Sequence, residues 1–165
     1  FDGIDDYVEI PGLLGKSRNI TISIWANLRV GDTSGAEAVS LGDYVGIRLD
    51  GNGNKGVMGF YYDGTTWHAT TTGTFYAGAG WHHVVYVIDA SNNSQNVYID
   101  GVVMGSTVHT QSLSYSGLGS NTFIGKHGNG ISNYDFNGLI DDVRVYNRAL
   151  SNQEVQNLYN IGINP

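Results

Sequence analysis

The sequence predicts an all-β protein in which two antiparallel sheets pack into a sandwich of the jelly-roll kind, followed by one short C-terminal helix. Three observations predict this class. About ten short runs alternate between apolar and polar residues, with turn residues between them. Gly occupies 24 of the 165 positions, which a helical bundle would not tolerate. The aromatic share is 12% and the charged share only 14%, whereas disordered chains are poor in aromatics and rich in charge.

The segment 20–28 is the clearest predicted strand. It reads I-T-I-S-I-W-A-N-L, so Ile20, Ile22 and Ile24 share one face while Trp25 lies on the other. This alternation with a period of two is typical of a half-buried strand. The further predicted strands are, in chain order, Val45–Leu49, Val57–Tyr62, His83–Ile88, Asn96–Ile99, Val102–Ser106, Asn121–Gly125 and Leu139–Tyr146.

Two tight turns and one helix complete the prediction. Asp-Gly pairs stand between strand-like residues at 63–64 and 100–101. Such a pair favours a type I′ turn, which needs positive φ, so each predicts a β-hairpin. Near the end, Ser151 and Glu154 fit a capping box, in which each side chain accepts from the other's backbone N–H. A helix is therefore expected after Ser151, with Gly162 as its stop.

The charge balance excludes several kinds of partner. With 15 acidic residues against 8 Lys and Arg, the formal net charge is −7. Nucleic acids and anionic membranes both require clustered cations, so we expect neither as a partner. No apolar run reaches the roughly 18 residues of a membrane span. The chain has no Cys, which excludes disulfides and thiolate zinc sites.

The chain starts at Phe1 without a signal-peptide pattern. We therefore expect residues 1–165 to form a single monomeric domain that belongs to a larger secreted or cell-surface protein and is attached to other domains there.

Several motifs together resemble a known family. They are FDGIDDYVEI at 1–10, TISIWANL at 21–28, GWHHVVYVID at 80–89 with VYIDG at 97–101, and FNGLIDDVRVYNRALSNQEVQNLY at 136–159. In this order they resemble the laminin-G-like (LamG) jelly roll of the concanavalin A-like lectin/glucanase superfamily, in its bacterial branch. The resemblance implies a concanavalin A-like sandwich. It does not fix a function, because that superfamily holds lectins, carbohydrate-binding modules, glycosidases, lyases and adhesins.

The acidic residues argue against catalysis. The glucanases of this superfamily carry a Glu-x-Asp-x-x-Glu motif, but this chain has Glu only at 9, 37 and 154, and none of them begins such a motif. Asp141 and Asp142 are adjacent, so on a strand they point to opposite faces and cannot share one glycosidic bond. We therefore expect no enzymatic activity.

A structural calcium site is expected where the two ends of the chain meet. The resemblance implies that the N- and C-terminal strands lie side by side, which would bring Asp2 and Gly3 near Asp141. Carboxylate and backbone oxygens suit Ca²⁺. Asp141 shares a strand face with Val143 and is expected to point toward the core, where a lone carboxylate is costly. The alternative is that Asp141 pairs with Arg144 or accepts from backbone amides.

Trp67 is the first candidate for binding sugar. It follows the hairpin at 63–64 among small and polar residues, and an exposed indole can stack on the apolar face of a pyranose. Trp67 with Tyr61 or Tyr62 and His68 would form such a platform. The alternative is that Trp67 only covers the sheet against a loop. Trp25, by contrast, matches the family's strand Trp and is expected in the core, and Trp81 is expected to be structural.

A polar loop at 126–135 is the second candidate. Its His127, Tyr134 and Asp135 suit recognition of hydroxyl groups, and its Gly residues allow close approach. The alternative is an ordinary solvated loop. Asp43 with Tyr44 is a third candidate.

Together these features predict a non-catalytic, lectin-like module that binds a polysaccharide or glycan and carries a structural calcium ion. Two other functions stay open. One is an adhesion or scaffolding domain that binds protein or spaces other domains, and the other is a divergent glycosidase or lyase.

Overall fold

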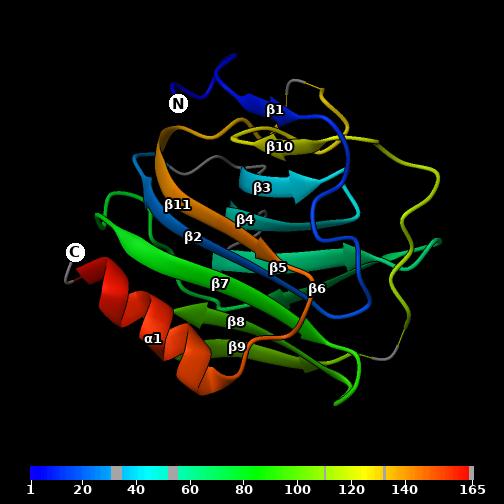
Figure 1. The fold of residues 1–165 in the computed structure, drawn as a ribbon. Helices are drawn as coiled ribbons and strands as arrows, with labels where there is room; N and C mark the ends of the chain where they lie inside the picture. Colours follow the sequence, from blue (N-terminus) through cyan, green and yellow to red (C-terminus); the bar gives the residue numbers. More distant parts are fainter. Residues whose placement is uncertain (31–34, 52–55, 110, 132, 164–165) are drawn as a thin grey trace.

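A computed structural model describes residues 1–30, 35–51, 56–109, 111–131 and 133–163, and its course is drawn in Figure 1. The elements are β1 (Val8–Ile10), β2 (Ile20–Leu28), β3 (Ala36–Leu41), β4 (Val45–Gly51), β5 (Gly56–Tyr62), β6 (Trp67–Thr71), β7 (His82–Asp89), β8 (Ser94–Ile99), β9 (Val102–Val108), β10 (Thr122–Ile124), β11 (Gly138–Tyr146) and α1 (Asn152–Ile163).

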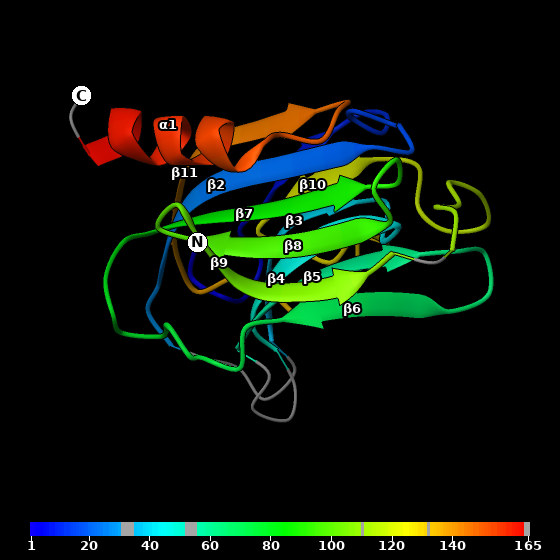
Figure 2. The ribbon, with the colours of Figure 1, turned by 90° about the horizontal axis from the view of Figure 1, so that it is seen from below.

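Two antiparallel sheets form the sandwich, which confirms the predicted fold class. The six-stranded sheet has the order β1-β10-β3-β4-β5-β6, and the five-stranded sheet has the order β11-β2-β7-β8-β9. The five-stranded sheet lies in front of the other in Figure 1, and Figure 2 shows the same layers from below. Strands distant in sequence, such as β2 and β11, are neighbours, so the chain crosses repeatedly between the layers as in a jelly roll.

The core lies between the sheets and follows the alternation of the strands. Ile20, Ile22 and Ile24 of β2 are completely buried there, as are Ile47 of β4 and Tyr61 of β5. The predicted inward face of β2 is therefore confirmed. The residues between these positions point away from the core, so each sheet also presents an outer face.

Helix α1 covers part of the outer face of the five-stranded sheet (Figure 2). Its Val155 is buried in a second apolar cluster with Val85 and Val87 of β7. The capping box is confirmed, because Ser151 N donates to Glu154 Oε2 at 2.8 Å and Glu154 N donates to Ser151 Oγ at 3.3 Å. The helix continues through Gly162 to Ile163, one residue beyond its predicted stop. No helix in the described ranges is long and apolar enough to span a membrane.

Trp25 packs under this helix and not in the sandwich core, so that prediction is wrong. It lies on the outward-facing side of β2, opposite His83 of β7. Its indole stacks on Tyr159 of α1 with ring centroids 5.8 Å apart. The sequence pattern placed Trp25 on this face correctly, but it did not reveal that a helix covers the face.

The two predicted hairpins differ in their turns. Asp100 and Gly101 have φ values of 52° and 78°, which confirms the type I′ turn between β8 and β9. Between β5 and β6 only Gly64 of the Asp-Gly pair has positive φ, and Asp63 N donates to Thr66 O at 3.1 Å. That hairpin exists, but its loop is longer and is not type I′.

A bulge in β11 corrects the predicted orientation of Asp141. The register with β2 shifts between Asp141 and Arg144, and Asp142 has a φ of 48°. An extra residue at this point moves the alternation by one position. Asp141 is therefore exposed, whereas Val143 and Val145 pack against the core.

Candidate functional site

Side chains on the outer face of the six-stranded sheet surround a hollow of about 410 Å³, which we name the sheet-face hollow. Strand register explains how they meet, because residues that lie directly opposite each other share a face. Arg48 of β4 lies opposite Met58 of β5, and Phe60 lies opposite Ala69 of β6. The residues that line the hollow are Asp43, Arg48, Met58, Phe60, Trp67, Ala69, His127 and Tyr134.

Trp67 forms one wall of this hollow and is held in a fixed orientation. Its side chain is 49% exposed. The indole Nε1 donates to the carbonyl oxygen of Asp43 at 3.1 Å. Tyr62, the cross-strand partner of Trp67, lies against it with ring centroids 4.6 Å apart. The predicted Trp67–Tyr62 pair therefore exists, and its exposed indole surface is available for stacking.

His68 lies on the other face of β6, so its predicted place in the platform is wrong. Its ring stacks on the buried Tyr61 at 4.8 Å, and its Nε2 pairs with Asp63 Oδ2 at 2.7 Å. Adjacent residues on a strand point to opposite faces, so Trp67 and His68 cannot share one surface. The hydrogen bond from His68 and three more from Thr65 and Thr66 lower the pKa of Asp63.

The loop between β10 and β11 folds back over the sheet and completes the hollow. The ring of Tyr134 lies 3.9 Å from the guanidinium carbon of Arg48 and stacks on His127 at 5.1 Å. Arg48 Nη2 donates in turn to Glu37 Oε2 at 2.8 Å. His127 and Tyr134 were predicted as a site separate from Trp67. The structure brings both candidates into one hollow.

The polar groups at the base of the hollow are buried. The pKa of Asp43 rises to about 6, because burial disfavours its charged form and the carboxylate of Glu37 adds repulsion. The charges of His127 and Arg48 act in the opposite direction. His127 Nε2 lies 3.7 Å from Asp43 Oδ1. Asp43, the third sequence candidate, is thus part of the same site.

Sequence reasoning missed two of the charged residues here and misplaced one. Glu37 and Arg48 face each other because β3 pairs with β4 in that register, and no local motif encodes this pairing. A charged residue within the strand-like run V-G-I-R-L was the available signal for Arg48. Asp135, which was predicted to contact ligand, is partly buried beside Phe136 and does not line the hollow.

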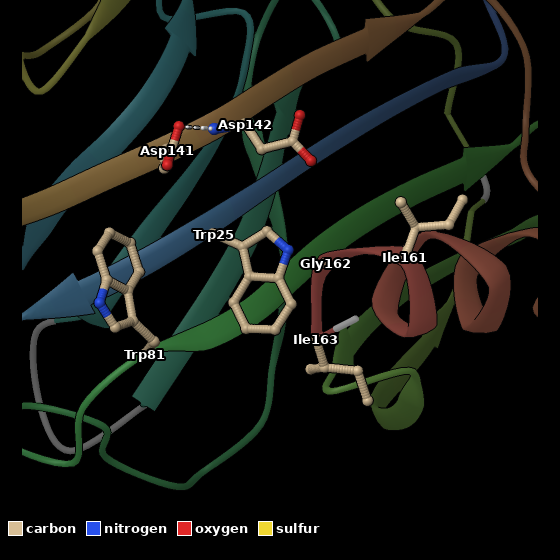
Figure 3. A pocket seen from close by; sticks show the side chains of 7 residues that line it. All are labelled: Trp25, Trp81, Asp141, Asp142, Ile161, Gly162 and Ile163. Carbon is tan, nitrogen blue, oxygen red and sulfur yellow. Dashed lines mark hydrogen bonds between the residues drawn. The ribbon is translucent and has the colours of Figure 1, made fainter. Parts of the chain in front are cut away.

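A second hollow of about 510 Å³ lies on the opposite side of the sandwich, and we name it the helix-side groove. Figure 3 shows Trp25 between Trp81 and the last turn of α1, with Asp141 and Asp142 to one side. Trp81 is 43% exposed and lines this groove, and its expected structural role stays a prediction. Ile161 and Ile163 add exposed apolar surface. The Asp142 carboxylate forms an ion pair with Arg144, in which Oδ2 and Nη2 are 2.8 Å apart.

The residues predicted to bind calcium do not come together. Asp2 forms one isolated bridge with Asn137 just before β11. However, β1 pairs with β10 in the six-stranded sheet, whereas β11 belongs to the five-stranded sheet, so the N-terminal and last strands do not pair as expected. Asp141 lies four residues further along β11, or roughly 13 Å at the rise of a strand. Gly3 lies against Asn137, whereas the carboxylates near Asp2 are those of the exposed Asp5 and Asp6. Asp141 is therefore separated from Asp2 and Gly3, and calcium binding near Asp2 stays a prediction.

The chain belongs to the concanavalin A-like lectin/glucanase superfamily, since a family model of that description matches residues 2–156. This confirms the resemblance seen in the motifs. Among proteins of curated function, none matches the chain significantly.

Three solved structures illustrate the likeness. Domain 4 of AbnA, a GH43 extracellular arabinanase from Geobacillus stearothermophilus in complex with arabinotriose, is 24% identical with a TM-score of 0.74, covering 96% of this chain and 74% of that one. A heptameric SAP-like pentraxin from Limulus polyphemus is 15% identical with a TM-score of 0.66, covering 96% and 79%. A Trypanosoma rangeli sialidase is 16% identical with a TM-score of 0.67, covering 96% and 26%. At these identities the likeness concerns the fold.

Proposed function

We propose that this domain is a non-catalytic carbohydrate-binding module of a secreted or cell-surface protein, and that it binds a glycan in the sheet-face hollow. The observation that carries the proposal is the position of Trp67 in this hollow. Its half-exposed indole is fixed by a hydrogen bond to the carbonyl of Asp43 and stands beside polar groups in a hollow of about 410 Å³. A concave site with aromatic walls and a few convergent polar groups is the usual form of a small-ligand site.

The two parts of the hollow suit the two parts of a sugar. The C–H face of a pyranose or furanose ring is apolar and stacks on an aromatic ring, which Trp67 provides. The hydroxyl groups need donors and acceptors, which Asp43, His127 and the hydroxyl of Tyr134 provide. Both kinds of surface face one hollow, so a single ring can use them together.

Family membership supports this choice of ligand without fixing it. The superfamily is named for lectins and glucanases, and the similar domain from the arabinanase was solved with arabinotriose. That relative belongs to an extracellular enzyme, which supports the proposed secreted or surface location. The particular glycan is a matter for a binding screen, in which arabinan oligosaccharides belong.

The burial of Glu37 supports a non-catalytic role. Carboxylate oxygens of Glu37 and Asp43 lie within 4.8 Å of each other, a spacing near the roughly 5 Å of retaining glycosidases. However, Glu37 is completely buried and is paired with Arg48, so a glycosidic bond cannot reach it. Asp43 lines the hollow without Glu37, and a single carboxylate does not make the pair that glycoside hydrolysis requires.

The helix-side groove favours a second candidate, an adhesion domain that binds protein. Trp81, Ile161 and Ile163 expose apolar surface beside two carboxylates there, and such patches mark interaction sites in many proteins. This candidate predicts that Trp81, and not Trp67, controls binding.

The test compares these two exposed tryptophans. A glycan screen that includes arabinotriose identifies a ligand, and its affinity is then measured for wild type, Trp67→Ala and Trp81→Ala. We expect Trp67→Ala to weaken binding between several-fold and about tenfold, since stacking contributes about 0.5–1.5 kcal/mol. We expect Trp81→Ala, a matched control of similar exposure, to bind as wild type does.

Three outcomes would contradict the proposal. The first is that no glycan binds. The second is that a glycan binds and only Trp81→Ala weakens it. The third is that the purified protein releases reducing ends from a bound glycan and Asp43→Asn abolishes the release, which would identify an enzyme.

A further inference from the structure

We propose that Glu37, Asp43 and His127 form a binding site for a divalent transition-metal ion, represented here by Zn²⁺, at the base of the sheet-face hollow. The three residues come from different segments: β3, the turn between β3 and β4, and the loop after β10. All are buried, with exposed fractions of 0%, 7% and 7%. One ligand atom from each lies within 4.8 Å of the other two.

Glu37 gives a second, independent reason to expect an ion. Its Oε2 accepts from Arg48, but within the described part of the chain Oε1 is buried without a hydrogen-bond partner. A buried carboxylate oxygen in this state is rare and indicates an ion or water that completes its bonding. A carboxylate oxygen of Glu37 also lies within 4.8 Å of one from Asp43, which is a second acceptor. A cation between them satisfies both carboxylates at once.

The kind of ion follows from the donor atoms. Ca²⁺ and Mg²⁺ prefer sets made only of oxygen, whereas imidazole nitrogen with carboxylate oxygen suits Zn²⁺. A tetrahedral Zn²⁺ with ligands at about 2.0–2.2 Å sets its donor atoms about 3.3–3.6 Å apart. Asp43 Oδ1 and His127 Nε2 are already 3.7 Å apart, so these two ligands need little movement. The third lies within 4.8 Å of them and needs to approach by at most about 1.5 Å.

Neighbouring groups hold two of the three side chains in place. Arg48 fixes the Glu37 carboxylate, and the Tyr134 ring stacks on His127. Such outer contacts orient ligands and are typical of metal sites. Binding at Nε2 places the imidazole proton on Nδ1, where the long contact from Asn129 N at 3.3 Å must relax. The Arg48 charge opposes the ion as well, so we expect reversible binding that EDTA removes.

The proposed ion lies next to the sheet-face hollow, and its binding does not require a sugar. Asp43 and His127 both line the hollow, so the fourth coordination position opens toward it. That position can take water or a ligand hydroxyl. The site is thus a property of the protein alone and goes beyond the proposed glycan binding.

The experiment measures metal binding in the absence of glycan. Protein stripped with EDTA is titrated calorimetrically with Zn²⁺, Mn²⁺ and Ca²⁺, and its thermal unfolding is followed with and without each ion. We expect one Zn²⁺ per chain, a raised Tm because the ion binds the folded state, and no competition from Ca²⁺. Glu37→Gln and His127→Gln each weaken Zn²⁺ binding at least about tenfold.

His68→Gln is the matched control. His68 also contacts a carboxylate, that of Asp63 at 2.7 Å, but it lies on the other face of β6, so its replacement leaves Zn²⁺ affinity unchanged. A second measurement uses wild type only, so it does not depend on whether a variant folds. It follows the imidazole ¹⁵N resonances of the protein by NMR during Zn²⁺ titration, and we expect those of His127 to shift. The proposal is overturned if wild type shows no saturable Zn²⁺ binding, if His127 does not shift, or if His68→Gln weakens binding as much as His127→Gln. Because no glycan is present, these outcomes leave the carbohydrate proposal untouched.

Discussion

At the scale of single residues, Trp67 and Trp81 show that exposure alone does not define a binding group. Their exposed fractions are similar, 49% and 43%. Trp67 is additionally fixed by its hydrogen bond to Asp43 and faces a hollow with buried polar side chains. Pre-organisation of this kind lowers the entropic cost of binding.

Residue type predicted part of this site and could not predict the rest. Trp67, Tyr62, His127 and Tyr134 were found because aromatic and polar residues stood in turn-rich segments. Glu37 and Arg48 were missed, since their contact depends on long-range pairing of β3 with β4. The error at His68 was avoidable, because strand alternation already separates it from Trp67.

The buried His83 makes the free energy of unfolding depend on pH. Burial lowers its pKa to about 4, from an ordinary value of 6.5, although the charges of Asp100 and Asp142 act in the other direction. The unfolded chain therefore takes up a proton below pH 6.5 that the folded chain excludes until about pH 4. The stabilising contribution is complete above pH 6.5 and is lost as the pH falls toward 4, by about 3 kcal/mol in all.

The measurement compares wild type with His83→Gln by urea unfolding between pH 7.5 and 4. Asp43 acts in the opposite direction, because its raised pKa of about 6 favours proton uptake by the folded state, and it is present in both proteins. The difference between the two proteins therefore isolates His83. A difference that does not change over this pH range would contradict the assignment.

At the scale of elements, local sequence patterns predicted that a strand or helix exists better than they predicted its detailed geometry. The strand β2 and the capping box of α1 were read correctly, because alternation and capping are short-range signals. The bulge at Asp142 was not foreseen, and it reversed the predicted direction of Asp141. The loop at 63–66 likewise departed from type I′, because the Asp63 side chain accepts hydrogen bonds from Thr65 and Thr66.

The capping box gives a prediction for the helix. Ser151→Ala removes the side-chain acceptor for Glu154 N, and we expect a loss of about 1 kcal/mol in the free energy of unfolding. Gln153→Ala, in the same exposed first turn, is the control and should change stability little. Chemical denaturation of the three proteins measures the effect. Equal stability of Ser151→Ala and wild type would show that the cap does not contribute.

At the scale of the whole molecule, the jelly-roll connectivity creates the site. The chain between β10 and β11 passes over the six-stranded sheet and brings Tyr134 onto Arg48. Two segments that the sequence offered as alternative sites, the Trp67 strand and the 126–135 loop, thereby become one hollow. Composition and motifs predicted the fold and family membership, but only the three-dimensional arrangement joins these segments and separates Asp141 from Asp2.

The most direct test of the account follows the indole N–H resonances of the protein during titration with a glycan identified by the screen. The chain has 3 Trp. Trp67 lies in the sheet-face hollow, whereas Trp25 and Trp81 both line the helix-side groove. We predict that the glycan shifts the Trp67 signal in a saturable manner and leaves the other two in place. Saturable shifts of Trp25 and Trp81 with an unmoved Trp67 signal would contradict the proposed site.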